Sequence, residues 1–334
     1  MLKLLTIVFF LCLALFFVGA KIISPIDSND SKIQNFIVTE GENADQIASG
    51  LSDVGLIRST FVFKLIAKIF DLDRNFKSGD YRLSKSLSAP VIAYKLTSGG
   101  NVSVQLLEGW NSLEIAEKWE MQGLGKSADF LQSVNDLAWR SQYDFLAELP
   151  AKQNLEGYLF PDTYELNAGA KPNDLIKKML DNFSRKLDAK MLAEIKRRGL
   201  TVFEVMTMAS IVEKEAGGDC LNGGTNVAMV ADIFYRRLKM SMALQSDATV
   251  NYITGLSKIQ PTWSETRTNS PYNTYLNRGL PPGPISNPGL CAITATVYPK
   301  TNPYLYFLTS KDGHNFYYAS SYEEHLANKY KHLD

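Results

Sequence analysis

The sequence predicts an α+β protein with more than one domain and an N-terminal transmembrane helix. A strand, a turn ending in Glu-Gly or Glu-Gly-Trp, and an Asn-capped helix follow one another twice, at residues 36–48 and again at 104–116. Apolar residues at helical spacing dominate residues 126–198, and a further compact unit follows Leu200. At 334 residues, the chain is long enough for two or three domains.

The N-terminus predicts a membrane anchor. Residues 4–20 are almost entirely apolar and lie between Lys3 and Lys21, at the lower length limit of a bilayer span. We expect residues 1–21 to be a retained anchor, residues 22–35 a polar tether, and the rest of the chain to be exported. The small residues that end the run also fit a signal peptide cleaved after Ala20, so that alternative stays open.

Composition narrows the class of protein. The 35 basic residues balance the 35 acidic ones, which argues against a binder of nucleic acid. His314, His325 and His332 all lie near the C-terminus without a cysteine cluster, so we expect no metal site, and no organic cofactor is implied. Cys220 and Cys291 can pair in an oxidising compartment or remain free thiols, and the sequence leaves both possibilities open.

The first part of the exported chain reads as a small β-α domain. Residues 36–38 are expected to form a strand, and Asn43 to cap the helix that follows. A second helix is expected at about 59–70, a turn and strand at 77–83, and a short helix at 90–96. Further on, the aromatic segment 155–164 is punctuated by Gly and Pro and predicts a loop or short hairpin within the mainly helical region.

One helix carries the best candidate for an acid. Thr201 and Glu204 form a capping box, and the helix that they open is apolar on most sides until a glycine stop at 217–218. Glu213 and Glu215 lie in its last turn, about 200° apart around the axis. Apolar surroundings and the negative end of the helix dipole both raise the pKa of Glu215, which suits a general acid. A solvated glutamate at a frayed helix end is the alternative.

Several segments in the same order resemble the YceG-like (MltG) family of endolytic murein transglycosylases, over nearly the whole chain. They are KSGDYRL at 77–83, EGYLFPDTY at 156–164, MTMASIVEKE at 206–215, VADIFYRRL at 230–238, LQSDATV at 244–250, SPYNTY at 270–275, GLPPGPI at 279–285 and PYLYF at 303–307. The resemblance implies a LysM-like domain at 36–103 and a catalytic domain at 104–334. Within the latter, 104–198 holds a second β-α unit and a mainly helical part, and 199–334 is the YceG-like core.

The resemblance also implies the reaction and its setting. Glu215 would protonate the bond between N-acetylmuramic acid and N-acetylglucosamine in peptidoglycan strands, then take a proton from the muramyl C6 hydroxyl, leaving a 1,6-anhydro end. The protein would be held in the cytoplasmic (inner) membrane, with its catalytic domain on the periplasmic or cell-wall side, beside peptidoglycan synthases. One carboxyl that alternates between acid and base differs from the two carboxylates of ordinary glycosidases.

Other candidate site residues offer hydrogen-bonding groups or flat rings to a sugar. The candidate glycan contacts are Gln245, Asp247, Tyr272, Asn273, Thr274 and Tyr275. The alternative is a structural role, since Asn and Pro loops fold on their own side-chain bonds and tyrosines are often part of the core. Glu156 and Asp162 are candidates for a second acidic group, with capping or turn roles as the alternative. Ser210 and Glu213 are expected to support the helix that carries Glu215.

The chain departs from the family pattern beside Glu215. The loop at 216–225 is longer and richer in Gly than usual, residues 226–227 replace a Glu-Arg pair, and Arg236 replaces an Asn. Asp219 could supply the missing acidic group, and the loop could be mobile and cover the cleft.

Two other functions remain open. A glycoside hydrolase would cut the same strands but leave reducing ends. A non-catalytic scaffold would hold glycan near the synthases, and its cellular function would survive replacement of Glu215 by Gln.

Overall fold

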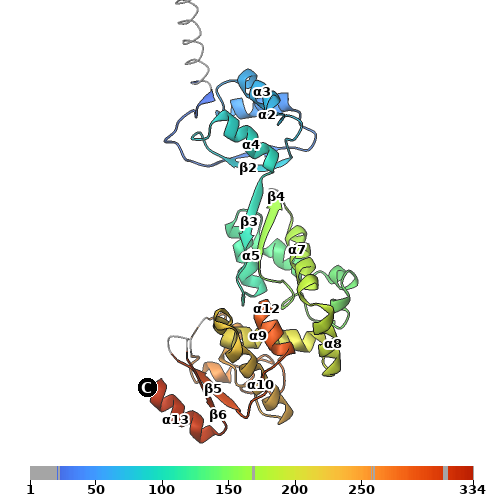
Figure 1. Cartoon of the computed structure of the whole chain (residues 1–334), viewed down its shortest axis with the longest axis vertical. Coiled ribbons are helices and arrows are strands. Elements are labelled where there is room, and N and C mark those ends of the chain that lie inside the picture. The colour runs from blue at the N-terminus through green and yellow to red at the C-terminus, as the bar shows by residue number, and fades with distance from the viewer. Residues whose placement is uncertain are drawn as a thin grey trace, which may run out of the picture. The chain divides into compact units, whose positions relative to one another are not determined.

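The structure is a computed structural model that describes residues 21, 23–167, 170–256, 258, 260–310 and 315–333 (Figure 1). The apolar run at 4–20 lies outside the described residues, so the anchor and the cleavage after Ala20 stay predictions. In the described part, no helix is both long enough and apolar enough to cross a bilayer. Helices and three two-stranded sheets make up this part, which confirms the mixed α+β composition.

The chain divides into two compact units. Unit 1 comprises Met1–Ser103 and Glu165–Ala170, and unit 2 comprises Val104–Tyr164 and Lys171–Asp334. The second segment of unit 1 was not predicted. Its residues up to Asn167 belong to strand β4 (Thr163–Asn167), which pairs with β3 (Asn101–Gln105). The loop or short hairpin expected at 155–164 therefore leads into a strand.

Unit 1 is built from the predicted strands and helices. Its elements are β1 (Gln34–Val38), α2 (Ala44–Asp53), α3 (Thr60–Ile69), β2 (Gly79–Leu83) and α4 (Ala89–Ser98). Asn43 caps α2 in the expected capping box with Gln46. In the antiparallel β1–β2 pair, Phe36 lies opposite Tyr81. Both are buried, whereas Ile37 is exposed, so the alternation typical of a strand places one face on the core.

Unit 2 holds the remaining elements. They are α5 (Ser112–Met121), α6 (Ser127–Val134), the 3₁₀ segments η1 (Leu137–Ser141) and η2 (Asp144–Leu146), α7 (Pro172–Lys186), α8 (Ala189–Arg197), α9 (Val202–Ala216), η3 (Gly217–Asn222), α10 (Thr225–Lys239), α11 (Asp247–Thr254), η4 (Glu265–Arg267), α12 (Leu290–Val297), β5 (Tyr306–Thr309), β6 (Phe316–Ala319) and α13 (Tyr322–His332). Asn111 caps α5 through a capping box with Glu114, so the second strand–turn–helix plan is present as predicted.

The centre of unit 2 is the packing of α9 against α10 and α12 (Figure 1). Their shared core includes Ile211, Val230, Phe234 and Ala292. Near the C-terminus β5 and β6 pair antiparallel, and α13 packs on both strands. The helix that carries Glu215 is therefore fixed from several sides.

Candidate active site

The helix α9 is locked in place before it reaches the candidate acid. Thr201 Oγ1 accepts a hydrogen bond from the Glu204 backbone N–H at 3.1 Å, and the Glu204 carboxylate accepts one from the Thr201 N–H at 2.8 Å. This is the predicted capping box. Every residue from Val205 to Glu213 is buried, so Glu215 emerges from a helix whose rotation and depth are set by the core.

Glu215 lies in a polar site surrounded by protein. Its side chain keeps some solvent exposure, and the Ser246 hydroxyl donates to Glu215 Oε1 at 2.5 Å. Burial raises the pKa of Glu215, and the nearby charge of Asp247 raises it further. The Ser246 hydroxyl, the Ala248 N–H and the Arg237 guanidinium oppose that rise because they stabilise the carboxylate.

A second layer of bonds holds the Ser246 segment. The Ser246 N–H donates to Thr274 Oγ1 at 3.0 Å, and the Gln245 N–H donates to the Thr274 carbonyl at 3.1 Å. The Tyr275 hydroxyl donates to Asp247 Oδ1. Gln245 has a φ of 52°, a left-handed conformation that is uncommon for a residue other than glycine. Four of the predicted site residues thus lie on the segment that bonds Glu215 or on the one that bonds to that segment: Gln245, Asp247, Thr274 and Tyr275.

The buried members of this group are not free to contact a sugar, contrary to the expectation for Asn273 and Thr274. Asn273 is fully buried, and its amide donates to the carbonyls of Thr266 and Thr268 at 3.0 and 2.8 Å. Thr274 is 1% exposed. Their roles are to shape the loop. Tyr272 is half-buried, with its ring centre 5.1 Å from that of Tyr252.

Arg237 is a site residue that the sequence analysis missed. It is buried on α10, where Nε donates to the Leu305 carbonyl at 2.7 Å and Nη1 to the Leu244 carbonyl at 2.6 Å. Burial lowers its own pKa, and its charge lowers that of Glu215. A signal was present in the sequence, because Arg237 follows the apolar Val230 and Phe234 at helical spacing on the buried face of the helix.

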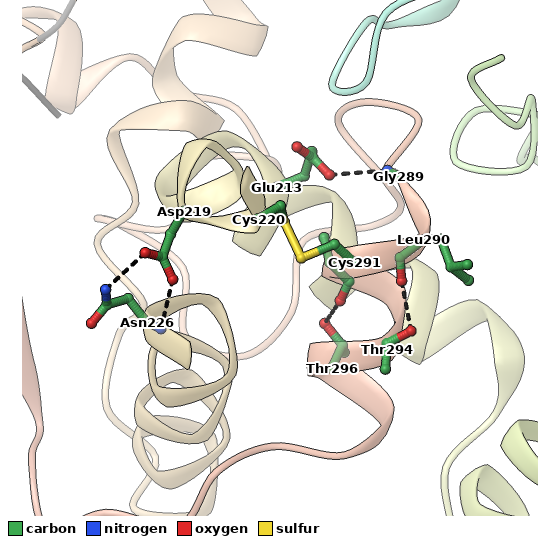
Figure 2. The surroundings of a disulfide bond; sticks show 10 residues. Glu213, Asp219, Cys220, Asn226, Gly289, Leu290, Cys291, Thr294 and Thr296 are labelled. Atoms are coloured by element: carbon green, nitrogen blue, oxygen red, sulfur yellow. Dashed lines mark hydrogen bonds between the residues drawn. A yellow bond between two sulfur atoms is a disulfide. The ribbon is translucent and has the colours of Figure 1, made fainter. Parts of the chain in front are cut away.

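Glu213 is directed to a different partner from Glu215, as expected of residues on opposite sides of a helix. Glu213 Oε2 accepts the N–H of Gly289, just before α12, at 2.9 Å (Figure 2). Burial, together with the charge of Glu108, raises the pKa of Glu213 to about 7. A Cβ on Gly217 would lie 2.0 Å from Glu213 Oε1. Gly217 therefore makes room for this carboxyl, and with a φ of −56° it does not end the helix in a left-handed turn.

Ser210 and Glu156 hold loops around the core. Ser210 Oγ accepts the Ile285 N–H at 3.0 Å, and its carbonyl accepts the Ser286 hydroxyl at 3.2 Å. Glu156 is buried, accepts the Ser112 N–H at the start of α5, and accepts the Asn287 amide at 2.8 Å. Burial raises the pKa of Glu156 to about 7. The capping alternative for Glu156 thus matches its contacts.

Asp162 has a similar local role. It accepts the Thr163 N–H at 2.7 Å and the Asn182 amide at 2.9 Å. These bonds fix the start of β4.

The loop after Glu215 is fixed by a disulfide bond. It forms η3, and a disulfide joins Cys220 to Cys291 on α12 (Figure 2). Asp219 accepts the Asn226 N–H at 2.8 Å and its amide at 2.9 Å, so it caps α10 and does not replace an acidic group beside Glu215. In the described part of the chain, no three His, Cys, Asp or Glu side chains converge as metal ligands would.

Comparison with known proteins places this chain among bacterial relatives. Residues 36–331 match the model of the YceG-like family. A protein named endolytic murein transglycosylase from Streptococcus pneumoniae (strain D39) is 32% identical over 338 residues, which cover 93% of this chain but 60% of that protein. One with the same name from Bacillus subtilis (strain 168) is 30% identical over 333 residues, which cover 95% of this chain and 90% of that protein.

A solved structure agrees in fold. The crystal structure of a YceG-like protein from Listeria monocytogenes superposes with a TM-score of 0.60 at 31% identity, and the match covers 89% of this chain and 99% of that one. Because the family match spans both compact units, this protein belongs to the YceG-like family.

Proposed function

We propose that this protein is an endolytic murein transglycosylase in which Glu215 is the single catalytic acid and base. The observation that carries the proposal is the environment of the Glu215 carboxyl. Burial raises its pKa, so the carboxyl stays protonated to higher pH, while the Ser246 hydroxyl and the Arg237 charge stabilise its anion. The names of the streptococcal and Bacillus relatives support the choice of substrate. The match covers only 60% of the streptococcal relative, so the activity in that protein's name comes to this chain as a proposal.

The reaction needs one carboxyl and no water. The Glu215 proton passes to the glycosidic oxygen as the bond from that oxygen to C1 of N-acetylmuramic acid breaks, which frees the N-acetylglucosamine hydroxyl. The resulting carboxylate takes the proton of the C6 hydroxyl, and the C6 oxygen bonds to C1 to close the 1,6-anhydro ring. Glu215 ends the cycle protonated. Because it must first donate a proton and then accept one, its pKa should lie above that of an ordinary carboxyl and near the working pH.

The neighbours of Glu215 suit both halves of this cycle. Asp247 favours the protonated form, which is needed when the glycosidic bond breaks. The Ser246 hydroxyl and Arg237 favour the anion, which is needed when the C6 hydroxyl is deprotonated. In this proposal Gln245, Tyr272 and Tyr275 are the side chains of the expected group that meet the glycan.

Asp247 is the observation that favours the alternative function, a glycoside hydrolase. A hydrolase requires a second carboxylate to activate water or attack C1, and Asp247 is close enough to Glu215 to raise its pKa. The Tyr275 hydroxyl already bonds Asp247, which favours the transglycosylase.

Mass analysis of digested glycan strands tests the proposal. The full chain in detergent should give fragments with anhydro ends, each lighter by one water than a hydrolysis product. Glu215→Gln should lower the rate by about 100-fold or more, because general acid–base catalysis typically contributes that much. Reducing ends would establish the hydrolase instead, and undiminished cellular function of Glu215→Gln would favour the scaffold.

We also propose that unit 1 is a LysM-like module that binds glycan. Its β1-α2-α3-β2 order supports this, as does a cavity of about 400 Å³ between the loop after β1 and the segment before β2. Thr39, Glu42, Phe76 and Lys77 are among the residues that line it. Exchanging Phe76 for Ala should weaken co-sedimentation with purified peptidoglycan sacculi, and unchanged sedimentation would exclude this cavity as a glycan site.

The setting of the protein is proposed from its N-terminus. The apolar run at 4–20 supports a single-pass anchor in the cytoplasmic membrane. Membership of the family supports a catalytic unit on the periplasmic or cell-wall side, with peptidoglycan synthases as partners. Recovery of the full chain in the membrane fraction after a salt wash would support the anchor. Recovery of a chain that begins after Ala20 in the soluble fraction would instead establish cleavage.

A further inference from the structure

Trp263 stands out among the tryptophans of unit 2. Its side chain is 71% exposed, whereas Trp119 and Trp139 are buried in the core. An indole is a large apolar group, and leaving it in water gives up the free energy that burial would provide. An aromatic side chain held in solvent by an ordered loop is therefore a candidate contact surface.

The segment that presents Trp263 is ordered by its own hydrogen bonds. Thr262 N–H donates to Glu265 Oε2 at 2.7 Å, and the Thr262 hydroxyl donates to the same oxygen at 2.8 Å. Lys258 Nζ pairs with Glu265 Oε1 at 2.5 Å, and the Lys258 carbonyl accepts the Asn251 amide at 2.7 Å. These bonds tie the segment back to α11, so little conformational entropy is left to lose when a ligand meets the indole.

Arg267 fixes the orientation of the ring. Its guanidinium carbon lies 3.6 Å from the centre of the Trp263 ring, which is the distance of a stacked cation–π pair. One face of the indole is thus covered. Because 71% of the side chain is still exposed, the opposite face is open to solvent. The result is a flat apolar plate with one free side.

The segment that carries Trp263 is connected to the candidate active site through a series of hydrogen bonds, each at least partly buried. The Asn273 amide donates to the carbonyls of Thr266 and Thr268, which follow Trp263 closely in the chain. The next residue, Thr274, accepts the Ser246 N–H, and Ser246 donates to Glu215. Each link is a direct bond within unit 2, so the plate and the acid belong to one framework.

We propose that the free face of Trp263 is a sugar-stacking subsite for the glycan strand, beyond the pair of sugars whose bond is cut. The inference rests on the proposed function. An enzyme that cuts inside a strand must hold sugars on both sides of the bond, and the C–H face of an N-acetylhexosamine packs on an indole plane. Arg267 is the positioning residue for the ring. Trp263 touches no reacting atom, so it contributes to binding and not to bond cleavage.

Binding to the full-length Glu215→Gln protein tests the subsite without turnover. The probe is a glycan strand freed of its peptides, and its binding is followed by isothermal titration calorimetry, which does not depend on the indole that the variants remove. Trp263→Ala in this background should raise the Kd by about tenfold, a typical value for loss of an aromatic contact. Trp263→Phe, which keeps a flat ring, should lie between the two. Tyr330→Ala is the matched control, because Tyr330 is 78% exposed on α13 and should leave the Kd unchanged.

Kinetics in the otherwise unaltered enzyme give a second measurement. Trp263→Ala should raise KM by a similar factor with kcat within about twofold, because a remote subsite supplies uniform binding. An unchanged thermal midpoint would show that the exposed position tolerates the change.

The outcomes separate the subsite from the proposed function. If the strand binds Trp263→Ala as tightly as its parent while the enzyme still cuts strands, the subsite is wrong and the function stands. If the Glu215→Gln parent binds no strand and the unaltered enzyme cuts none, both are overturned.

Discussion

Glu215 and Glu213 show how two residues in one helical turn acquire different roles. Both have a raised pKa, and burial is the main cause for each. The Glu213 carboxyl is already engaged with the backbone N–H of Gly289. Glu215 instead meets a hydroxyl and keeps some exposure, so its proton can reach a ligand. Of the two, Glu215 is therefore the one suited to acid catalysis.

Replacing the neighbours of Glu215 should shift its titration in opposite directions. Activity requires a protonated acid, so the rate should fall as pH rises through the pKa of Glu215. Ser246→Ala removes a bond that stabilises the carboxylate and should move this alkaline limb to higher pH. Asp247→Asn removes a repelling charge and should move it to lower pH. The measurement is kcat/KM against pH for both variants, and shifts in the same direction would contradict the assigned roles.

At this scale, the sequence predicts what is local. The position of Glu215 in the last turn of an apolar helix could be inferred from spacing alone. Ser246 and Arg237 could not be assigned to it, because 31 residues separate Ser246 from Glu215 and the fold alone brings them together. Asn273 was a candidate glycan contact because an amide can hydrogen-bond a sugar, but its amide already donates to the carbonyls of Thr266 and Thr268 within the loop.

The end of α9 is clamped to the start of α12 by a side chain that needs a glycine beside it. Gly217→Ala should displace the Glu213 carboxyl and leave the Gly289 N–H without its partner, at a cost of about 1–3 kcal/mol in the free energy of unfolding. Gly218→Ala is the matched control, since a Cβ there meets nothing within 4 Å. Urea unfolding of both variants measures the difference. Equal loss of stability would mean that the clamp contributes nothing.

The disulfide joins η3, the segment that follows α9, to α12 covalently. Cys220 and Cys291 are 71 residues apart, and closing a loop of that size stabilises the folded state by about 4 kcal/mol in the chain-entropy account. Adding a reductant should therefore lower the urea midpoint of the natural protein. The double variant Cys220→Ser/Cys291→Ser should show the lower midpoint with or without reductant. An identical midpoint for oxidised and reduced protein would contradict the stapling role.

Among the elements, those marked by local chemistry were predictable. The caps at Asn43, Asn111 and Thr201 all form as their side-chain spacing indicates. The strand β4 was not foreseen, because it depends on pairing with β3 about 60 residues earlier. For the glycine-rich segment η3 the sequence left mobility open as a hypothesis, since nothing local decides whether Cys220 has a partner on α12.

The whole molecule should lose stability as the pH rises towards neutrality. Glu156 and Glu213 each change from an ordinary pKa of 4.5 to about 7 on folding, mainly through burial. Below pH 4.5 both states hold these protons, and above it the unfolded chain releases them first. Their contribution to stability is thus full below pH 4.5 and is lost as the pH rises to about 7.

Glu156→Gln tests this dependence. The variant cannot ionise, so the slope of unfolding free energy against pH between 4.5 and 7 should be shallower than in the natural protein. The absolute stability also changes, because an amide offers one acceptor where the carboxylate offers two to Ser112 and Asn287. The slope alone is therefore compared, and an unchanged slope would contradict the raised pKa.

The order of elements over the chain followed from turn and cap chemistry, and the division into two compact units followed from packing. Glu165–Ala170 belongs to unit 1 although the chain before it, Val104–Tyr164, belongs to unit 2. Only the three-dimensional contacts reveal this connectivity. The resemblance to the family, by contrast, was carried by short strings in order between residues 77 and 307, and the family model matches residues 36–331, so no structure was needed to recognise it.

Digestion of glycan strands in water enriched in heavy oxygen tests the central claim most directly. If Glu215 takes the proton of the C6 hydroxyl and the C6 oxygen bonds to C1 without water, the new muramyl ends carry no heavy oxygen and have the mass of the anhydro sugar. They should vanish in Glu215→Gln. Incorporation of heavy oxygen at C1 would mean that water attacks the bond, and would contradict the account of Glu215 as a single acid and base.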